Sequence, residues 1–155
     1  MAVFLFIFLV LLIIYALLID YYRRAWNQMP EFESNDSIPA TYISIIVAVR
    51  NEEKNVDALL ESLSQQSYSK DLFQVIIIDD YSEDETWNKL TQFNPRGLNT
   101  LFTRLSDHTN EGEIIQSHKK KAIETGIKLA KGTLIVTTDA DCLFPVDWLI
   151  TIARF

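Results

Sequence analysis

The sequence predicts an α/β protein with a mostly parallel sheet and flanking helices, preceded by one N-terminal transmembrane helix. Two observations carry this prediction. An uncharged apolar run occupies residues 2–19. From residue 42 onward, short segments rich in β-branched residues alternate with segments of helical periodicity. Strands that are apolar on both faces and alternate with helices are typical of a parallel α/β sheet.

The N-terminal run is long enough to cross a membrane. At about 1.5 Å per residue it extends over about 27 Å, close to the roughly 30 Å hydrocarbon core of a bilayer. Residues typical of the membrane interface and its cytoplasmic side follow the run: Tyr21, Tyr22, Arg23, Arg24 and Trp26. We expect a single-pass signal anchor at 1–20, a juxtamembrane linker at 21–41 and a domain at 42–155 that faces the cytoplasm. A cleaved signal peptide or a buried core helix is the alternative.

Composition excludes several classes of protein. The chain has 155 residues and a net charge of −7, which is too acidic for a protein that binds nucleic-acid phosphates. Apolar residues make up 48 %, enough to bury a core, so general disorder is excluded. With one cysteine, Cys142, the chain cannot form an internal disulfide or a cysteine-rich zinc site.

The first half of the domain is predicted to contain two strand–helix units. Residues 42–49 (YISIIVAV) form a buried strand, and Asn51 caps the helix after it. One face of that helix is apolar: Val56, Leu59, Leu60 and Leu63. Residues 74–78 (QVIII) form the second strand, and a capping box from Ser82 to Glu85 opens a helix that ends near Phe93.

The second half continues the alternation. After a turn at 94–97 we expect a weaker strand at 100–105, a polar loop at 106–118 and a helix at 119–131 that ends at Gly132. The residues of this helix expected to point inward are Ala122, Ile123, Ile127 and Ala130. A strand at 133–138 follows, and Pro145 begins the last helix.

Polar residues follow three of the predicted strands: Asn51-Glu52-Glu53, Asp79-Asp80 and Asp139-Ala140-Asp141. Right-handed crossovers place the carboxyl ends of parallel strands at one edge of a sheet, where ligands bind in open α/β folds. We therefore expect these segments to converge despite their separation in sequence.

The Asp139 and Asp141 pair is the first candidate site. Two carboxylates in a turn after a strand suit Mg²⁺ or Mn²⁺, which completes its coordination with phosphate oxygens and water. The alternative is a solvated turn with an aspartate helix cap.

Three further segments are candidates for ligand contact. In Asp79-Asp80, a carboxylate at a strand end can accept from a base N–H or a ribose hydroxyl, or simply cap the next helix. The basic run His118–Lys121 lies at a helix N-terminus, where it opposes the helix dipole, so a diphosphate nearby or a solvated face explains it. A plain helix cap explains Asn51-Glu52-Glu53, and His108 and His118 show no metal-ligand spacing and are interpreted as surface residues.

Taken together, these segments resemble the family 2 glycosyltransferases, inverting sugar transferases of the GT-A (Rossmann-like) fold. The resemblance covers about residues 42–152 and is carried by four pieces: the N-terminal anchor, SIIVAVRNEEKNVDALLESLSQQSY, VIIIDDYSEDET and KKKAIETGIKLAKGTLIVTTDADC. It implies that residues from Val47 to Glu53 contact the nucleotide, namely Val47, Val49, Asn51 and Glu53.

The same resemblance assigns the other site residues. It implies that Asp80 binds the base, that Asp139 lies near the ribose and donor sugar, and that Asp141 coordinates Mg²⁺ or Mn²⁺ on the diphosphate, with Asp139 beside it. Lys119 matches the lysine of the family's K-A-x-A-L-N segment, although Glu124 replaces the usual asparagine.

The implied activity is transfer of a sugar from a nucleotide-sugar to an acceptor hydroxyl with inversion. A UDP-sugar is the favoured donor and a GDP-sugar is possible, while the acceptor is a lipid or a polysaccharide. The family's domain continues beyond the last strand seen here. We therefore expect 42–155 to be the donor-binding part of a C-terminally truncated domain, with the general base beyond Phe155 and no turnover by the chain alone.

Two other functions remain open. A non-catalytic, membrane-anchored nucleotide-binding module would have the same donor half. A receiver-like phosphoacceptor domain also uses an acidic pair and Mg²⁺, but its acidic pair follows the first strand, whereas Asp79-Asp80 follows the second.

Overall fold

The computed structural model describes residues 1–29, 39–94, 97–110 and 114–155. The chain divides into two compact units, Met1–Glu33 and Ser34–Phe155. Residues 30–38, 95–96 and 111–113 lie outside the described parts, so pieces of the expected linker, of the turn at 94–97 and of the loop at 106–118 are not described.

The first unit is the helix α1 (Ala2–Asn27), and none of its residues is buried. Its most apolar window has a mean hydropathy of 3.3, and α1 alone among the described helices is long and apolar enough to cross a membrane. The helix continues past Asp20, whose carboxylate accepts hydrogen bonds from Arg23 at 2.7 Å and Arg24 at 2.6 Å. The first seven residues expected in the linker, 21–27, are therefore helical.

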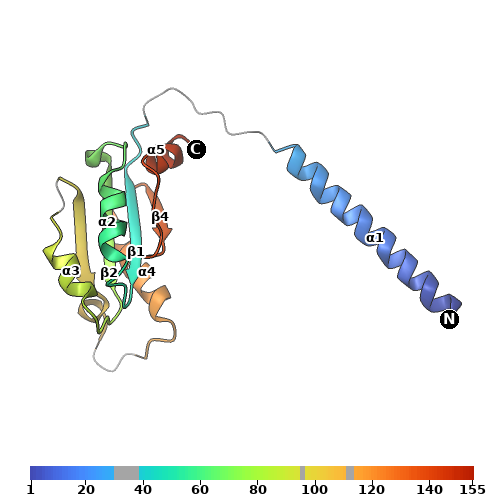
Figure 1. Ribbon diagram of the computed structural model, residues 1–155, viewed down its shortest axis with the longest axis horizontal. Coiled ribbons are helices and arrows are strands. Elements are labelled where there is room, and N and C mark those ends of the chain that lie inside the picture. The colour runs from blue at the N-terminus through green and yellow to red at the C-terminus, as the bar shows by residue number, and fades with distance from the viewer. Residues whose placement is uncertain (30–38, 95–96, 111–113) are drawn as a thin grey trace. The chain divides into compact units, whose positions relative to one another are not determined.

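The second unit is built on a four-stranded sheet. Its strands are β1 (Ile43–Val49), β2 (Phe73–Asp79), β3 (Asn99–Arg104) and β4 (Leu134–Thr138). They pair in the order β3-β2-β1-β4, and every pairing is parallel (Figure 1). This confirms the predicted α/β sheet. The central strands β1 and β2 are almost entirely buried, whereas the edge strands β3 and β4 are partly exposed.

Helices cover both faces of the sheet. Alternate residues of β1, from Ile43 to Val49, pack on the face covered by α2 (Val56–Ser64), α3 (Thr86–Gln92) and α5 (Trp148–Arg154). The predicted apolar face of α2 is buried in this layer: Val56, Leu59, Leu60 and Leu63. The opposite face packs against α4 (His118–Leu129). Gly126 makes this approach possible, because a Cβ there would collide with Ile46 and Ile78.

Two predicted helix starts are wrong. Helix α2 begins at Val56, with Asn55 as its N-cap, so Asn51 does not cap it. The capping box of α3 does not form either, because Ser82 accepts a hydrogen bond from the backbone N–H of Asn51 instead. Asn51 and Ser82 therefore form hydrogen bonds with each other's loops rather than capping the helices that follow them.

The last helix also starts later than predicted. Helix α5 begins at Trp148, three residues after Pro145. The side chain of Gln66 donates to the carbonyl of Pro145 at 2.9 Å and accepts from the N–H of Leu149 at 3.0 Å. This long-range contact satisfies the backbone groups on both sides of the helix start.

Helix α4 ends earlier than predicted, and of the residues expected to point inward Ala122 is fully buried and Ala130 packs against the same core cluster. It stops at Leu129, because Ala130 is extended and the chain turns to reach β1, where the N–H of Gly132 donates to Ser44 Oγ at 2.8 Å. A Cβ on Gly132 would lie 2.5 Å from the backbone N of Ser44, so this close approach requires glycine. Ile127, predicted to point inward, is 46 % exposed.

Candidate functional site

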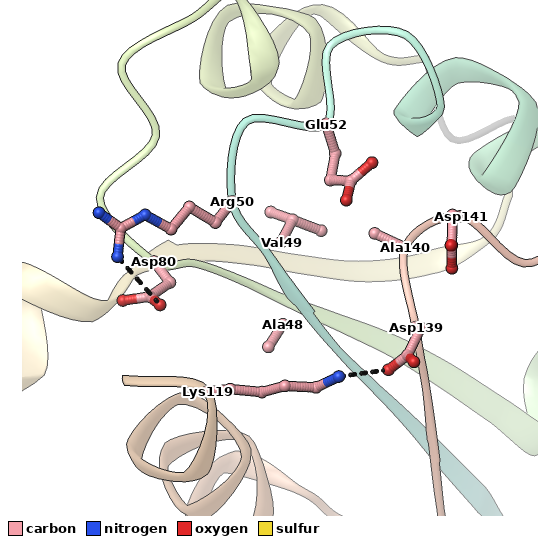
Figure 2. A pocket seen from close by; sticks show the side chains of 9 residues that line it. All are labelled: Ala48, Val49, Arg50, Glu52, Asp80, Lys119, Asp139, Ala140 and Asp141. Carbon is pink, nitrogen blue, oxygen red and sulfur yellow. Dashed lines mark hydrogen bonds and ion pairs between the residues drawn. The ribbon is translucent and has the colours of Figure 1, made fainter. Parts of the chain in front are cut away.

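A pocket of about 300 Å³ opens at the carboxyl edge of the sheet. Its lining comes from the ends of β1, β2 and β4 and from the first turn of α4: Ala48, Val49, Arg50, Glu52, Asp80, Lys119, Asp139, Ala140 and Asp141 (Figure 2). The structure therefore brings together five of the eight predicted site residues: Val49, Asp80, Lys119, Asp139 and Asp141. The other three, Val47, Asn51 and Glu53, do not line it.

The parallel register explains why these residues meet. Val47 of β1 pairs with Thr138 of β4, so the segments that follow these two strands leave the sheet side by side. On the other side of β1, the N–H of Asp80 donates to the carbonyl of Val49 at 2.8 Å. Arg50, Asp80 and Asp139 are thus placed by backbone pairing, as expected for a parallel sheet.

One end of the pocket carries the Asp139 and Asp141 carboxylates. Asp139 Oδ1 accepts a hydrogen bond from Lys119 Nζ at 2.7 Å, and the two side chains are 59 % and 61 % exposed. This hydrogen bond, together with the charge of Asp139, raises the pKa of the Lys119 ammonium above its ordinary value. Figure 2 shows this pair on one side of the pocket and Arg50 with Asp80 on the other.

The donor set suits a hard divalent cation that is shared with a ligand. Asp139 and Asp141 offer carboxylate oxygens, which Mg²⁺ and Mn²⁺ prefer. Within the described part of the chain, no group of three or more His, Cys, Asp or Glu side chains is placed to hold a metal. A cation here would therefore draw its remaining ligands from water and from a bound molecule.

The opposite end of the pocket carries Asp80, whose side chain is only 7 % exposed. Its Oδ1 lies 2.9 Å from His118 Nδ1, and its Oδ2 lies 4.0 Å from Arg50 Nη1. Interpreting His118 as a surface residue therefore missed a contact of the pocket. The signal available was its place beside Lys119, since these neighbouring side chains contact carboxylates at opposite ends of the pocket, Asp80 and Asp139.

The neighbouring aspartate has a different environment. Asp79 is the last residue of β2 and is 3 % exposed, and its Oδ1 has no hydrogen-bond partner among the described residues. Successive residues of a strand point to opposite faces, which separates the side chains of the predicted acidic pair. Only Asp80 lines the pocket.

The loops after β1 and β2 are joined by a hydrogen-bonded network that we call the loop clasp, made by residues 51–53 and 82–86. Backbone N–H groups of each loop donate to side chains of the other. The bonds are Asn51 N to Ser82 Oγ (2.9 Å), Glu52 N to Thr86 Oγ1 (2.8 Å), Glu53 N to Asp84 Oδ2 (3.1 Å), Glu83 N to Asn51 Oδ1 (2.8 Å) and Glu85 N to Glu53 Oε2 (3.2 Å). The clasp holds the loops that carry Arg50 and Asp80.

Three residues predicted to touch a nucleotide have other contacts in the structure. Asn51 and Glu53 direct side-chain oxygens to the other loop, and Val47 is fully buried in the core. Burial alone would raise the pKa of Asp84, but hydrogen bonds from Thr86 and from the Glu53 N–H lower it below its ordinary value. Asn51 also adopts a left-handed conformation with φ of 55°, which asparagine tolerates better than most residues.

Comparison with known proteins identifies the family. The sequence model described as "Glycosyl transferase family 2" matches residues 44–155. The Glycosyltransferase AglE of Haloferax volcanii is 28 % identical over 108 residues, which cover 70 % of this chain and 33 % of that protein. Poly(ribitol-phosphate) beta-N-acetylglucosaminyltransferase TarS of Staphylococcus aureus is 32 % identical over 112 residues, which cover 72 % of this chain and 18 % of that protein.

Solved structures agree with this match. TarS in complex with UDP-GlcNAc superposes with a TM-score of 0.59 at 28 % identity, covering 72 % of this chain and 30 % of that one. Mannosyltransferase PcManGT from Pyrobaculum calidifontis, solved with GDP-Man and Mn²⁺, superposes with a TM-score of 0.66 at 23 % identity. The match covers 88 % of this chain and 39 % of the PcManGT chain, and it supports the GT-A fold. The chain spans about a third or less of the length of the curated relatives AglE and TarS. The chain belongs to glycosyl transferase family 2.

Proposed function

We propose that the pocket binds the nucleotide-sugar donor of a metal-dependent, inverting glycosyltransferase. The observation that carries this proposal is the convergence of Asp80, Lys119, Asp139 and Asp141 on one pocket. It offers an acceptor for a base at one end, and carboxylates beside a lysine at the other. The relative TarS, 28 % identical in its solved structure, was crystallised with UDP-GlcNAc, which supports a UDP-sugar as the favoured donor and leaves a GDP-sugar as the alternative.

Each residue has a proposed role, which the family resemblance implies and its position in the pocket allows. Asp80 accepts an N–H of the base, Asp139 lies toward the ribose and donor sugar, and Lys119 compensates charge on the diphosphate. Because Lys119 and Asp139 lie 2.7 Å apart, a diphosphate that approaches the lysine also approaches a carboxylate. The negative charges of the diphosphate and of the Asp139 carboxylate repel each other, and a divalent cation between these two groups offsets that repulsion. We therefore propose that Asp139 and Asp141 hold Mg²⁺ or Mn²⁺ together with the diphosphate.

The proposed reaction is direct displacement at the anomeric carbon. When bound, the cation neutralises charge that develops on the leaving nucleoside diphosphate. The chain's own residues position the donor: Asp80 orients the base, and Lys119 stabilises the phosphate oxygens electrostatically. A general base for the acceptor hydroxyl is also required, and we assign that role to none of the residues 1–155.

We further propose that α1 anchors the enzyme in a membrane, with the domain on the cytoplasmic side. The apolar part of the helix has no buried residue and ends at aromatic and basic residues that suit a membrane interface. A lipid or a polysaccharide made at that membrane is then the proposed acceptor. The proposed anchor occupies 1–20 and the donor-binding part 42–155, and the first residues of the linker at 21–41 continue α1 as far as Asn27.

Titration calorimetry of UDP into the detergent-solubilised full chain, with Mn²⁺ present, tests the donor site. We expect saturable binding that Asp80→Ala weakens about tenfold, because a hydrogen bond to a charged group is lost. Asp71→Ala is the matched control, since Asp71 precedes β2 and does not line the pocket. A folded wild-type chain that binds neither UDP nor GDP would refute the proposal.

A further inference from the structure

His118 holds one oxygen of the carboxylate that faces the base end of the pocket. Its Nδ1 lies 2.9 Å from Asp80 Oδ1, and the Asp80 side chain is 7 % exposed. An ionised carboxylate only accepts hydrogen bonds, so the proton between the two groups belongs to Nδ1 of the imidazole. The contact therefore sets which ring nitrogen of His118 is a donor.

The imidazole is also held from a second side. The ring of Tyr81 meets it edge to face, with ring centres 5.6 Å apart, and the Tyr81 hydroxyl lies 3.2 Å from Thr109 Oγ1. Tyr81 itself has a left-handed backbone, with φ of 56°, in the loop that also carries Asp80. His118 is thus clamped between two successive residues of one loop.

The contact makes the two oxygens of Asp80 unequal as acceptors for a ligand. Oδ1 is committed to His118, whereas Oδ2 lies 4.0 Å from the nearest nitrogen of Arg50, beyond hydrogen-bond length. The Watson–Crick edge of guanine presents two neighbouring donors, N1–H and N2–H, which a carboxylate accepts with both of its oxygens. Uracil presents a single donor, N3–H, between two carbonyls, and one oxygen is enough for it.

We propose that His118 is a specificity-determining residue that restricts Asp80 to one acceptor oxygen and thereby favours uridine over guanosine diphosphates. The inference rests on the proposed donor site and names the residue that selects the base. His118 acts through Asp80 and is a positioning residue. Its neighbour Lys119 contacts the other end of the pocket, at Asp139, so base selection and phosphate binding are separable by substitution.

The test is the ratio of the GDP and UDP dissociation constants, measured on the detergent-solubilised full chain with Mn²⁺. We expect the wild type to prefer UDP and His118→Ala to lower the ratio about tenfold, as both oxygens of Asp80 become available to guanine. His118→Asn should restore most of the preference, because its amide nitrogen can replace Nδ1 as donor. His108→Ala is the matched control, since His108 contacts Thr103 and does not line the pocket.

The outcomes distinguish failure of the proposed role of His118 from failure of the proposed donor site. If the wild type binds UDP but His118→Ala leaves the ratio unchanged, the inference is wrong and the donor site stands. If the wild type binds neither nucleotide, both fail. A two-bond ¹H–¹⁵N correlation spectrum of the histidine rings checks the contact without any nucleotide: it should show a protonated Nδ1 on His118 that Asp80→Ala abolishes, and an unprotonated Nδ1 in the wild type overturns the inference.

Discussion

The two ends of the pocket are built differently. The end that carries Asp80 is formed by the loops after β1 and β2, which the loop clasp joins through hydrogen bonds between residues more than 30 positions apart in sequence. The acidic end follows the edge strand β4, and the Lys119–Asp139 ion pair joins it to the first turn of α4. The Asp80 side chain is 7 % exposed, whereas that of Asp139 is 59 % exposed.

In the proposed donor site, this difference would combine a rigid contact to the base with adjustable contacts to the diphosphate. A preorganised acceptor loses little conformational entropy when it binds a base. Carboxylates that share a cation with a diphosphate need freedom to adjust to the metal and to the phosphate oxygens. We therefore expect substitutions in the clasp to change stability and substitutions at the acidic end to change binding.

Thr86→Val should have the largest effect on stability. Thr86 is fully buried, and its Oγ1 accepts from the Glu52 N–H and donates to Asp84 at 2.5 Å. Valine leaves the Glu52 N–H unsatisfied and removes one of the hydrogen bonds to Asp84, so the free energy of unfolding should fall by about 2–3 kcal/mol in urea titrations of the full chain. Thr91→Val, exposed on the same helix, should stay within about 0.5 kcal/mol. Equal losses for the two variants would contradict the importance of the clasp.

Asn51 separates the clasp hydrogen bond from the backbone conformation. Asn51→Ala removes the acceptor for the Glu83 N–H and places alanine at a φ of 55°, so we expect a loss of about 1–2 kcal/mol. Asn51→Gly removes the same acceptor but adopts this conformation without strain, and should be the more stable of the two variants. The same urea titrations decide this, and a less stable glycine variant would refute the strain argument.

Acid should weaken the clasp through Asp84. Its folded pKa lies below the unfolded value of about 3.9, so its contribution to stability is present above that pH and is lost as the pH falls through the folded pKa. The stability difference between wild type and Asp84→Asn should therefore shrink as the pH falls from about 6 to about 3. Asp71→Asn, remote from the clasp, is the control. A difference that stays constant over this range would contradict the assignment.

Lys119→Ala should have the smallest effect on stability. The Lys119–Asp139 pair is exposed, so its loss should change the free energy of unfolding by less than about 0.5 kcal/mol. UDP binding should nevertheless weaken about tenfold, because a charge beside the diphosphate is lost. Lys120→Ala, also exposed and one residue away, should change neither quantity. A large loss of stability in Lys119→Ala would contradict the expectation that substitutions at the acidic end change binding rather than stability.

The sequence predicts the sheet and the edge of the site, because both depend on local patterns. Continuous apolar runs mark β1 and β2, weaker patterns mark β3 and β4, and parallel pairing then brings Asp80 and Asp139 to the same edge. The loop clasp and the His118–Asp80 contact could not be predicted, because their partners are 31 to 38 residues apart. The predicted helix starts are wrong for the same reason, because Asn51, Ser82 and Gln66 form hydrogen bonds with segments distant in sequence.

The central claim is that the acidic end binds a nucleotide diphosphate together with a divalent cation. The most direct measurement is UDP binding to the full chain with and without Mn²⁺, repeated on an Asp139→Asn/Asp141→Asn double variant, with Asp71→Asn/Asp107→Asn as a charge-matched double control outside the pocket. We predict saturable binding that requires Mn²⁺, that the double variant loses and that the control retains. Metal-independent binding, or equal binding by the folded double variant, would contradict the claim.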